Sequence, residues 1–514
     1  MSIDLSLDRV KRLLVQLPPY TRPTLHIAGT NGKGSVSALL TSILLSVDPP
    51  LRVGRFNSPH LISIYDCITI NNVPVPPSLY DTVRAEVELA DKEHQRKLSN
   101  FEILTLIALQ IFEKSRMDIV VLEVGMGGRL DATNVVPDSA IAVSALTAVD
   151  LDHQAFLGDT VTKIAQEKAG IGRAGRPFVL AKQKHAGVKD AVKEVLSRLG
   201  SGTLVDAIEV RTREWSETVD GDRPPSFCLA SPFKLPAWQP ISVDLPCFPE
   251  TVNALLPLYG VHQLDNLGTS LSVIIELLSS PALQEVSSSL KLKERINVKN
   301  IAKGIQNVRW LGRLSFHTLR LASPPSKVSP DPLVVLVDGA HNPASAATLG
   351  DYITHLFGLY SECPCGAPRP NNFEVTYIIA LSHSPPKTPL ETLSPILPPN
   401  IPGHLITNVK TRVILLRFTP PYGMPWVRPV APEDMEVAVR SLVPDVELLN
   451  EADFGPPVGD KNVALESALK WIFQRRIEMS GMQEDKVELV VLAGSLYLVA
   501  DFYRILQTSP YNEL

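Results

Sequence analysis

Residues 24–37, TLHIAGTNGKGSVS, contain the stretch that decides the fold of this chain. An apolar run is followed by a glycine-rich turn with one lysine, and then by the start of a long apolar segment. This order predicts a β-strand, a phosphate loop and an α-helix. Glycines let consecutive backbone N–H groups turn inward, and the N-terminus of the helix adds partial positive charge. The stretch therefore predicts a site for the phosphates of a nucleotide.

The spacing within this loop differs from the usual nucleotide-loop pattern. An extra glycine separates Lys33 from Ser35, and the first glycine lies three residues before Gly32. A tight strand-to-helix turn with a solvated lysine would give the same letters. The loop alone therefore leaves both interpretations open, and the rest of the chain has to decide between them.

Length and composition narrow the class of protein. The 514 residues predict two to four domains, and 45% hydrophobic with 20% charged residues is typical of a soluble globular chain. A net charge of -5 argues against nucleic acid as a partner, so an anionic substrate needs local cations such as Lys33. Five scattered cysteines give no disulfide framework, and no apolar run is long enough to span a bilayer. We expect a cytosolic protein, because Asp4 and Asp8 disfavour a transit peptide.

Polar residues follow several of the predicted strands. Ser58 follows a strand over 52–56, Glu123 lies inside an apolar strand over 118–124, and His153 follows a strand over 140–146. Open α/β sheets bind ligands at the carboxyl ends of their strands, and acids there often approach Mg²⁺. Each residue also has a structural explanation: a backbone-bonded acid for Glu123 and a surface or core histidine for His153. Lys168 could simply complement a helix dipole.

A second α/β unit begins near Trp310, because prolines interrupt the chain before a new strand over 333–337. That strand ends in DGAHNP and is followed by further alternating strands and helices. Residues 200–250 are rich in proline and predict an irregular, partly β insertion. We expect a domain over 1–309 that contains this insertion and a second domain over 310–514.

Seven motifs, taken in order, resemble those of the folylpolyglutamate synthase and dihydrofolate synthase family, which belongs with the Mur-type ligases. Together they cover nearly the whole chain apart from the insertion and the proline-rich loops, and the unusual loop spacing is this family's own form. The motifs are GTNGKGS at 29–35, SPHL at 58–61, LEVGMGGRLDATN at 122–134, Asp152-His153 with Leu157-Gly158, EKAG at 167–170, His262-Gln263 with Asn266, and DGAHNP at 338–343.

The resemblance implies an α/β fold with an N-terminal P-loop Mur-ligase-like ATPase domain, built on a parallel sheet, and a smaller Rossmann-like C-terminal α/β domain that closes over the glutamate site. It implies ATP and Mg²⁺ as cofactors, and a lysine carbamate at Lys168. Lys33, Glu123, His153 and Lys168 would be the catalytic residues, and His341 would face the incoming amino acid. The ATP-binding set would be Gly32, Lys33, Gly34, Ser35, Asn266, Arg313 and Asp338, and the metal set Ser58, Glu123, His153 and Lys168.

The reaction that this resemblance implies is ATP-driven amide formation. A substrate carboxylate attacks the γ-phosphate, and the amine of L-glutamate then displaces phosphate from the acyl phosphate. We expect small-molecule partners, neither nucleic acid nor a membrane, and a monomer. Two departures from the family pattern are Asn57, where relatives often have a small hydroxyl residue, and Leu311, where many have proline.

The folate-side residues favour one member of the family. Residues 3–10, IDLSLDRV, resemble the segment with which bacterial members that act on dihydropteroate hold the pterin, although an ordinary amphipathic helix would look similar. Asn31 also favours this member of the family. In the polyglutamate-extending eukaryotic enzymes, the corresponding part of the loop resembles Thr-Lys-Gly. We therefore expect a dihydrofolate synthase. Its pterin pocket would be formed by Asp4, Leu5, Leu7, Phe101, Leu130, Asp131 and Ala132.

Three rival hypotheses stay open. A folylpolyglutamate synthase, or a bifunctional enzyme, would share the ATP and glutamate sites and differ in the folate-side pocket. A cell-wall ligase of the Mur type fits the 122–134 motif and the pterin-like N-terminus less well. A nucleotide-binding module without catalysis predicts damage at a catalytic position, yet Lys33, Glu123 and Lys168 are all present.

Overall fold

The chain in the computed structural model forms two compact units. The first comprises Met1–Gly221 and Gln239–Trp310, and the second comprises Asp222–Trp238 and Leu311–Leu514. The residues that the structure describes are 6–229, 233–321, 332–361, 372–401, 408–421, 424, 427–454, 462–479, 486–508 and 511–513.

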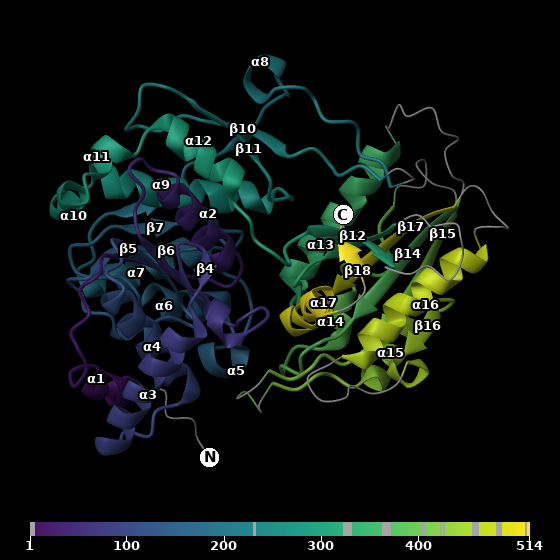
Figure 1. The fold of residues 1–514 in the computed structure, drawn as a ribbon, viewed down its shortest axis with the longest axis horizontal. Helices are drawn as coiled ribbons and strands as arrows, with labels where there is room; N and C mark the ends of the chain where they lie inside the picture. The colour runs from purple at the N-terminus through teal and green to yellow at the C-terminus, as the bar shows by residue number, and fades with distance from the viewer. Residues whose placement is uncertain are drawn as a thin grey trace. The chain divides into compact units, whose positions relative to one another are not determined.

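The first unit is organised around a largely parallel sheet. Its strands have the order β4-β3-β2-β5-β1-β6-β7-β8 (Figure 1), with β3 and β4 antiparallel to the rest. Because the other six strands are parallel, their carboxyl ends meet at one edge. The bounds are β1 Thr24–Ala28, β2 Val53–Phe56, β3 Ile68–Ile70, β4 Val73–Pro74, β5 Ile119–Glu123, β6 Ile141–Leu146, β7 Phe178–Leu180 and β8 Leu204–Asp206.

Helices cover both faces of this sheet, which explains why its central strands are apolar throughout. Alternate strand residues face opposite sides, so Leu25 and Ile27 join α2 and α9 in one core while Val120 and Leu122 join α4 in another. Helices α6 and α7 complete the second face. The helix bounds are α1 Asp8–Leu14, α2 Lys33–Leu45, α3 Pro77–Glu93, α4 Asn100–Lys114, α5 Gln154–Leu157, α6 Val161–Ala169, α7 Gly187–Leu199, α8 Glu217–Asp220, α9 His262–Ser279, α10 Gln284–Ser289, α11 Leu292–Arg295 and α12 Val298–Asn307, with 3₁₀ turns η1 Ile64–Cys67, η2 Ala132–Val135 and η3 Pro281–Leu283.

The second unit repeats the α/β theme with the strand order β16-β15-β14-β17-β13-β12-β18 (Figure 1). Strands β16, β15, β14, β17 and β13 are parallel, and β12 runs antiparallel to β13 and β18. The bounds are β12 Ser315–Leu321, β13 Leu333–Val337, α13 Pro343–Ser361, β14 Asn372–Ile379, α14 Pro389–Leu393, β15 Asn408–Leu415, α15 Pro432–Leu442, β16 Glu447–Asn450, η4 Glu451–Asp453, α16 Val463–Met479, β17 Lys486–Ala493, α17 Leu496–Thr508 and β18 Tyr511–Glu513.

The predicted α/β class with two mainly parallel sheets is confirmed. The expected insertion at 200–250 is divided between the units, and this differs from the sequence expectation, which placed all of it in the first domain. Part of it forms a small sheet, in which β10 (Gln239–Val243) pairs with β9 (Arg211–Thr212) and β11 (Val252–Leu256). Residues 222–238 group with the second unit instead. The physical reason is aromatic packing, because the rings of Phe227 and Phe233 lie 6.4 and 6.1 Å from that of Phe316.

None of the helices in the described part of the chain is long and apolar enough to cross a membrane.

A buried ion cluster joins four strands of the second sheet. Arg412 of β15 is fully buried and pairs with Glu374 of β14, and its guanidinium lies 3.2 Å from Glu447 of β16 and 3.6 Å from Glu488 of β17. Burial raises the pKa of Glu447, but hydrogen bonds from Arg412, Lys410 and Arg475 outweigh it and lower that pKa to about 2. Arg412 therefore neutralises carboxylates that could not be buried ionised without it.

Replacing Arg412 with methionine is expected to lower the free energy of unfolding by ~3–5 kcal/mol, because the buried Glu374 keeps only the more distant Arg475, at 3.9 Å, as its cation. Urea titration followed by circular dichroism measures this loss. Arg440→Met is the matched control, because Arg440 makes an exposed pair with Glu436 one helical turn away and should cost at most ~0.5 kcal/mol. Equal losses in the two variants would contradict the assignment.

Candidate active site

The phosphate loop joins β1 to α2, as the sequence predicts. Gly29 and Gly32 have φ values of +152° and +96°, and only glycine adopts the second of these without strain. A Cβ on Gly32 would lie 2.3 Å from Oδ1 of Asn266, the fifth residue of α9. The Asn266 amide also donates to Gln263 at 3.0 Å. The structure thus brings Asn266 against the loop, at the N-terminus of α2 where unpaired N–H groups favour an anion.

Trp310 packs against the same loop. A Cβ on Gly34 would lie 2.6 Å from Cζ2 of Trp310, so the close approach requires a glycine. The guanidinium of Arg55, on β2, lies 5.1 Å from the centre of the indole ring, within cation–π range. Burial lowers the pKa of Arg55 to about 10, while nearby Glu123 and Asp66 act in the opposite direction. Arg55 remains a cation at neutral pH and faces the sheet edge that carries Glu123.

Glu123 ends β5 and is 6% exposed. Its Oε2 accepts a hydrogen bond of 2.5 Å from the side-chain amide of Asn57, which follows β2. Asn57, a departure from the family pattern, thus orients the carboxylate that the sequence predicts as a metal ligand. Ser58 is the next residue and is half-buried. Glu123 and Ser58 therefore lie at the carboxyl ends of adjacent strands.

Two lysines share one backbone carbonyl in the loop. Lys33 Nζ donates to the carbonyl oxygens of Gly29 at 3.1 Å and Thr30 at 3.2 Å, and Lys168 Nζ donates to Gly29 at 2.8 Å. Lys168 is 3% exposed. Burial, followed by the charge of Lys33, lowers the pKa of Lys168 to about 7, although Asp152 opposes the shift. Near neutral pH a large share of this amine is uncharged.

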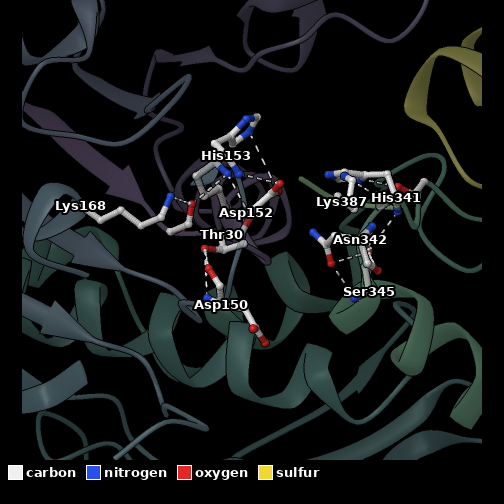
Figure 2. A network of polar contacts seen from close by, with 12 residues as sticks. Thr30, Asp150, Asp152, His153, Lys168, His341, Asn342, Ser345 and Lys387 are labelled. Atoms are coloured by element: carbon white, nitrogen blue, oxygen red, sulfur yellow. Dashed lines mark hydrogen bonds and ion pairs between the residues drawn. The ribbon is translucent and has the colours of Figure 1, made fainter. Parts of the chain in front are cut away.

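The segment after β6 returns to the loop, as Figure 2 shows. The Thr30 hydroxyl donates to the carbonyl oxygen of Asp150 at 3.1 Å, and its oxygen accepts the Asp150 N–H at 3.1 Å. His153 immediately precedes α5 and has φ +50°, and its Nε2 lies 4.0 Å from Asp152 Oδ2. The exposed His153 side chain thus stands beside Asp152 on a strained backbone, near Lys168.

The predicted metal site at the carboxyl edge of the first sheet contains one carboxylate, that of Glu123. The described residues contain no group of three or more His, Cys, Asp or Glu side chains that could hold a metal ion. Mg²⁺ is usually held by one or two carboxylates, and substrate phosphates and water complete its octahedron. Of the predicted set, Glu123 supplies a buried carboxylate beside the phosphate loop, which fits a Mg²⁺ that arrives with a nucleotide, and the ligand roles of Ser58, His153 and Lys168 stay predictions.

Residues 125–134, which we call the acceptor turn, contain three of the seven predicted pterin residues, Leu130, Asp131 and Ala132. Asp131 is buried and accepts the N–H of Met126 at 2.8 Å and of Thr133 at 3.0 Å. Burial raises its pKa in spite of these hydrogen bonds. Ala132 is buried, and Leu130 is 36% exposed.

The remaining predicted pterin residues fall into three situations. The Phe101 ring lies 2.3 Å from where a Cβ on Gly125 would stand, so it packs directly on the acceptor turn. Leu7 is buried in the core with α3 and α4, which favours a structural role for it. Asp4 and Leu5 lie outside the described residues.

In the second unit, Asp338 follows β13. Its carboxylate accepts the N–H groups of Leu314 and Ala340, both at 2.8 Å. Burial raises the pKa of Asp338, and the charge of Arg313 opposes that shift. A Cβ on Gly339 would lie 2.6 Å from Nη1 of Arg313, so the guanidinium lies directly over this turn. The two residues predicted to bind ATP from this unit are therefore neighbours.

His341 lies on the same turn, at the N-terminus of α13 (Figure 2). Its Nδ1 is 2.8 Å from the carbonyl oxygen of Gly339, and Lys387 Nζ donates to the His341 carbonyl at 2.6 Å. Ser345 Oγ accepts the N–H groups of His341 and Asn342, both at 3.1 Å. Ser345 and Lys387 thus fix the backbone of the turn. The side chains of His341 and Asn342 and the ammonium of Lys387 lie close together there.

Sequence reasoning missed Arg55, Trp310 and Lys387. Arg55, like Glu123, is a charged residue inside an apolar strand. The argument that predicted a functional role for Glu123 would therefore have predicted one for Arg55. Trp310 and Lys387 lie far along the chain from the loops that they contact and carry no local signal.

Comparison of the chain with known proteins identifies its family. A family model described as the C-terminal domain of dihydrofolate synthetase matches residues 319–505. The chain is 32% identical over 511 residues to the dihydrofolate synthetase of Saccharomyces cerevisiae, with 98% of each chain covered. The protein belongs to the dihydrofolate synthase and folylpolyglutamate synthase family. The resemblance stated from the sequence motifs is thereby confirmed.

Solved members of this family share its fold. Mycobacterium tuberculosis folylpolyglutamate synthase complexed with ADP superposes with a TM-score of 0.69 at 24% identity, covering 99% of this chain and 95% of the other. A bifunctional folylpolyglutamate synthase/dihydrofolate synthase with Mn, AMPPNP and L-glutamate bound gives a TM-score of 0.64 at 23% identity, covering 98% and 95%. At this identity the likeness establishes the fold.

The phosphate loop predicts the outcome of one substitution. Gly32→Ala is expected to weaken ATP binding about tenfold or more, because the positive φ strains alanine and the new Cβ meets Asn266. Isothermal titration with a non-hydrolysable ATP analogue measures the change. Gly175→Ala is the control, since Gly175 has φ +66° but no atom within 4 Å of an added Cβ. Equal weakening in both variants would mean that the loop is not the nucleotide site.

Proposed function

We propose that this protein is a dihydrofolate synthase, which joins L-glutamate to 7,8-dihydropteroate at the expense of ATP. One observation carries the proposal: the phosphate loop, Glu123 and Lys168 converge at the carboxyl edge of one parallel sheet. The match to the yeast dihydrofolate synthetase over almost the whole of both chains supports this acceptor. The protein would act on small molecules as a cytosolic monomer.

The first step is phosphoryl transfer to the acceptor. A carboxylate oxygen of dihydropteroate attacks the γ-phosphorus of ATP, the bond to the β,γ-bridging oxygen breaks, and an acyl phosphate and ADP form. Backbone N–H groups of Gly32 to Ser35 and the ammonium of Lys33 would stabilise the charge on the phosphates, and Asn266, Arg313 and Asp338 would hold the rest of ATP. Positioning and electrostatics supply most of the rate enhancement in such a reaction.

The second step forms the amide. The glutamate amine, which must lose a proton, attacks the acyl carbon, and the tetrahedral intermediate collapses with loss of inorganic phosphate. Mg²⁺, held by Ser58, Glu123, His153 and Lys168, would supply charge neutralisation on the phosphates. Exclusion of water would protect the acyl phosphate from hydrolysis, and closure of the second unit over the glutamate stays a prediction.

The glutamate side of the reaction would be served by the second unit. The incoming amino acid carries two carboxylates, which require cationic or N–H partners. His341 lies beside Lys387, and Asn342 and Ser345 fix the turn between them. We infer that the Lys387 ammonium gives this turn the positive charge that binding of glutamate needs.

The alternative is a folylpolyglutamate synthase or a bifunctional enzyme. Both would use the same loop and the same lysines, and relatives with these names share the fold. The acceptor therefore has to be tested directly.

The decisive assay is ATP-dependent incorporation of labelled glutamate by the purified protein, with dihydropteroate and tetrahydrofolate offered as separate acceptors. We expect product with dihydropteroate. Product with both acceptors would indicate a bifunctional enzyme, and product with tetrahydrofolate alone would overturn the dihydrofolate synthase assignment. Lys33→Ala and Glu123→Gln should each reduce incorporation about 100-fold or more.

Lys168 suits the carbamate that the family resemblance implies. A neutral amine adds CO₂ to give an N-carboxylate and one proton, and the lowered pKa makes that neutral amine available near pH 7. The carbamate would be an anion. It would replace the Lys168 ammonium, a cation that donates to the same Gly29 carbonyl as Lys33. It would add a second carboxylate to the metal set.

We expect activity to fall when CO₂ is removed and to recover with bicarbonate, with greater recovery above pH 7 than below it. The sign follows from the lowered pKa, because the neutral amine becomes the major form as the pH rises through about 7. Lys168→Ala should lose about 100-fold in rate and regain part of it with added acetate. Lys163→Ala is the control. Lys163 lies on the same helix as Lys168 and makes an exposed ion pair with Asp159. A fully active Lys168→Ala variant would exclude a role for the carbamate.

A further inference from the structure

Three buried side chains form a hydrogen-bonded chain between β1 and the acceptor turn. His26 Nε2 lies 2.8 Å from Thr133 Oγ1, and Thr133 Oγ1 lies 2.6 Å from Asp131 Oδ1. His26 and Thr133 are completely buried, and Asp131 is 5% exposed. Neither His26 nor Thr133 has a part in the function proposed above.

The direction of the hydrogen bonds follows from the acceptors. Asp131 Oδ1 already accepts the backbone N–H of Thr133, so the carboxylate accepts and the Thr133 hydroxyl donates to it. The lone pairs of Thr133 Oγ1 are then left for the imidazole, and His26 Nε2 carries the proton. His26 Nδ1 is buried without a hydrogen-bond partner in the described part of the chain, which a lone pair tolerates better than an N–H. Burial, followed by the charge of Arg173, lowers the pKa of His26 and keeps the ring neutral.

The far end of this chain fastens the acceptor turn. Asp131 Oδ1 holds Thr133 on one side, and Oδ2 accepts the N–H of Met126 at 2.8 Å on the other. Among the described residues, no cationic side chain pairs with the Asp131 carboxylate within 4.0 Å. The charge of Lys168 also acts on Asp131, but the hydrogen bonds that orient this carboxylate come from neutral donors, and Thr133 supplies the side-chain donor.

We propose that His26 and Thr133 are positioning residues for the acceptor substrate: through Asp131 they hold the acceptor turn in register with the phosphate loop. This proposal rests on the proposed function, since it assigns the acceptor turn to the pterin-type substrate. The physical basis is that His26 belongs to β1, which leads directly into the loop for the attacked phosphate. One strand thus fixes both partners of the phosphoryl transfer.

The test compares Thr133→Val, which removes the hydroxyl and keeps the shape, with Thr133→Ser, which keeps the hydroxyl. Thr133→Val should raise the KM for dihydropteroate about tenfold or more, because the carboxylate loses a charge-assisted hydrogen bond. The KM for ATP should change less than about twofold. Thr133→Ser should restore most of the acceptor affinity. Circular dichroism confirms that each variant is folded.

Ser144→Ala is the matched control. Ser144 pairs with His26 in the strand register, is equally buried, and donates to the Ile171 carbonyl at 2.9 Å. The Ser144→Ala variant loses one buried hydrogen bond at the same depth, but Ser144 lies outside the chain formed by His26, Thr133 and Asp131. The KM of this variant for dihydropteroate should therefore stay near that of the wild type. A rise as large as in Thr133→Val, or no rescue by serine, would overturn the proposal.

A second measurement separates this proposal from the proposed function. Spectra of ¹⁵N-labelled histidine, with the His26 signal assigned through His26→Gln, should show a neutral ring protonated at Nε2 and an altered signal in Thr133→Val. A ring protonated at Nδ1, or a signal unchanged in Thr133→Val, would overturn the chain of hydrogen bonds. A wild-type protein that ligates glutamate to neither acceptor would overturn the proposed function, whatever the histidine spectra show.

Discussion

The parallel pairing of β1 with β5 and β6 is the constraint on which the site in the first unit depends. Ile27 stands opposite Glu123 on one side, and Ala28 stands opposite Leu146 on the other. This register sets the phosphate loop between the acid of β5 and the segment that carries His153. A slip by one residue would reverse the faces of every side chain in β1. His26 would then lose Thr133, and polar Thr24 would enter the core beside α2.

The site concentrates like charges before any substrate binds. Lys33 and Lys168 donate to one carbonyl oxygen after β1, and Arg55 is buried on β2, which is separated from β1 by β5. Such an arrangement destabilises the protein, and the low pKa of Lys168 has burial as its larger cause and the charge of Lys33 as its second. A polyphosphate would offset the repulsion between Lys33 and Lys168, because it would bring further anions beside them. The edge of the sheet is therefore built for a ligand and is not optimised for stability alone.

The sequence predicted those parts of the site that local chemistry determines. Glycines before a helix and an acid inside an apolar strand are costly without a purpose, so Gly32 and Glu123 could be found from the letters alone. The partners of these residues could not be found in that way. Trp310 packs on Gly34 and Asn57 orients Glu123 because of tertiary packing, and no spacing rule links them. The grouping of 222–238 with the second unit depends in the same way on aromatic contacts that are distant in the sequence.

Under the proposed function, the pleat of β1 would let one strand serve two substrates. Leu25 and Ile27 face α2, whose N-terminus carries the phosphate loop, and His26 between them faces the opposite side, where Thr133 and the acceptor turn lie. Asp131 receives hydrogen bonds from both ends of that turn, so it organises the backbone that a substrate would meet. Under the proposed function, discrimination between acceptors would fall to the side chains that project from the turn or pack on it, such as Leu130 and Phe101.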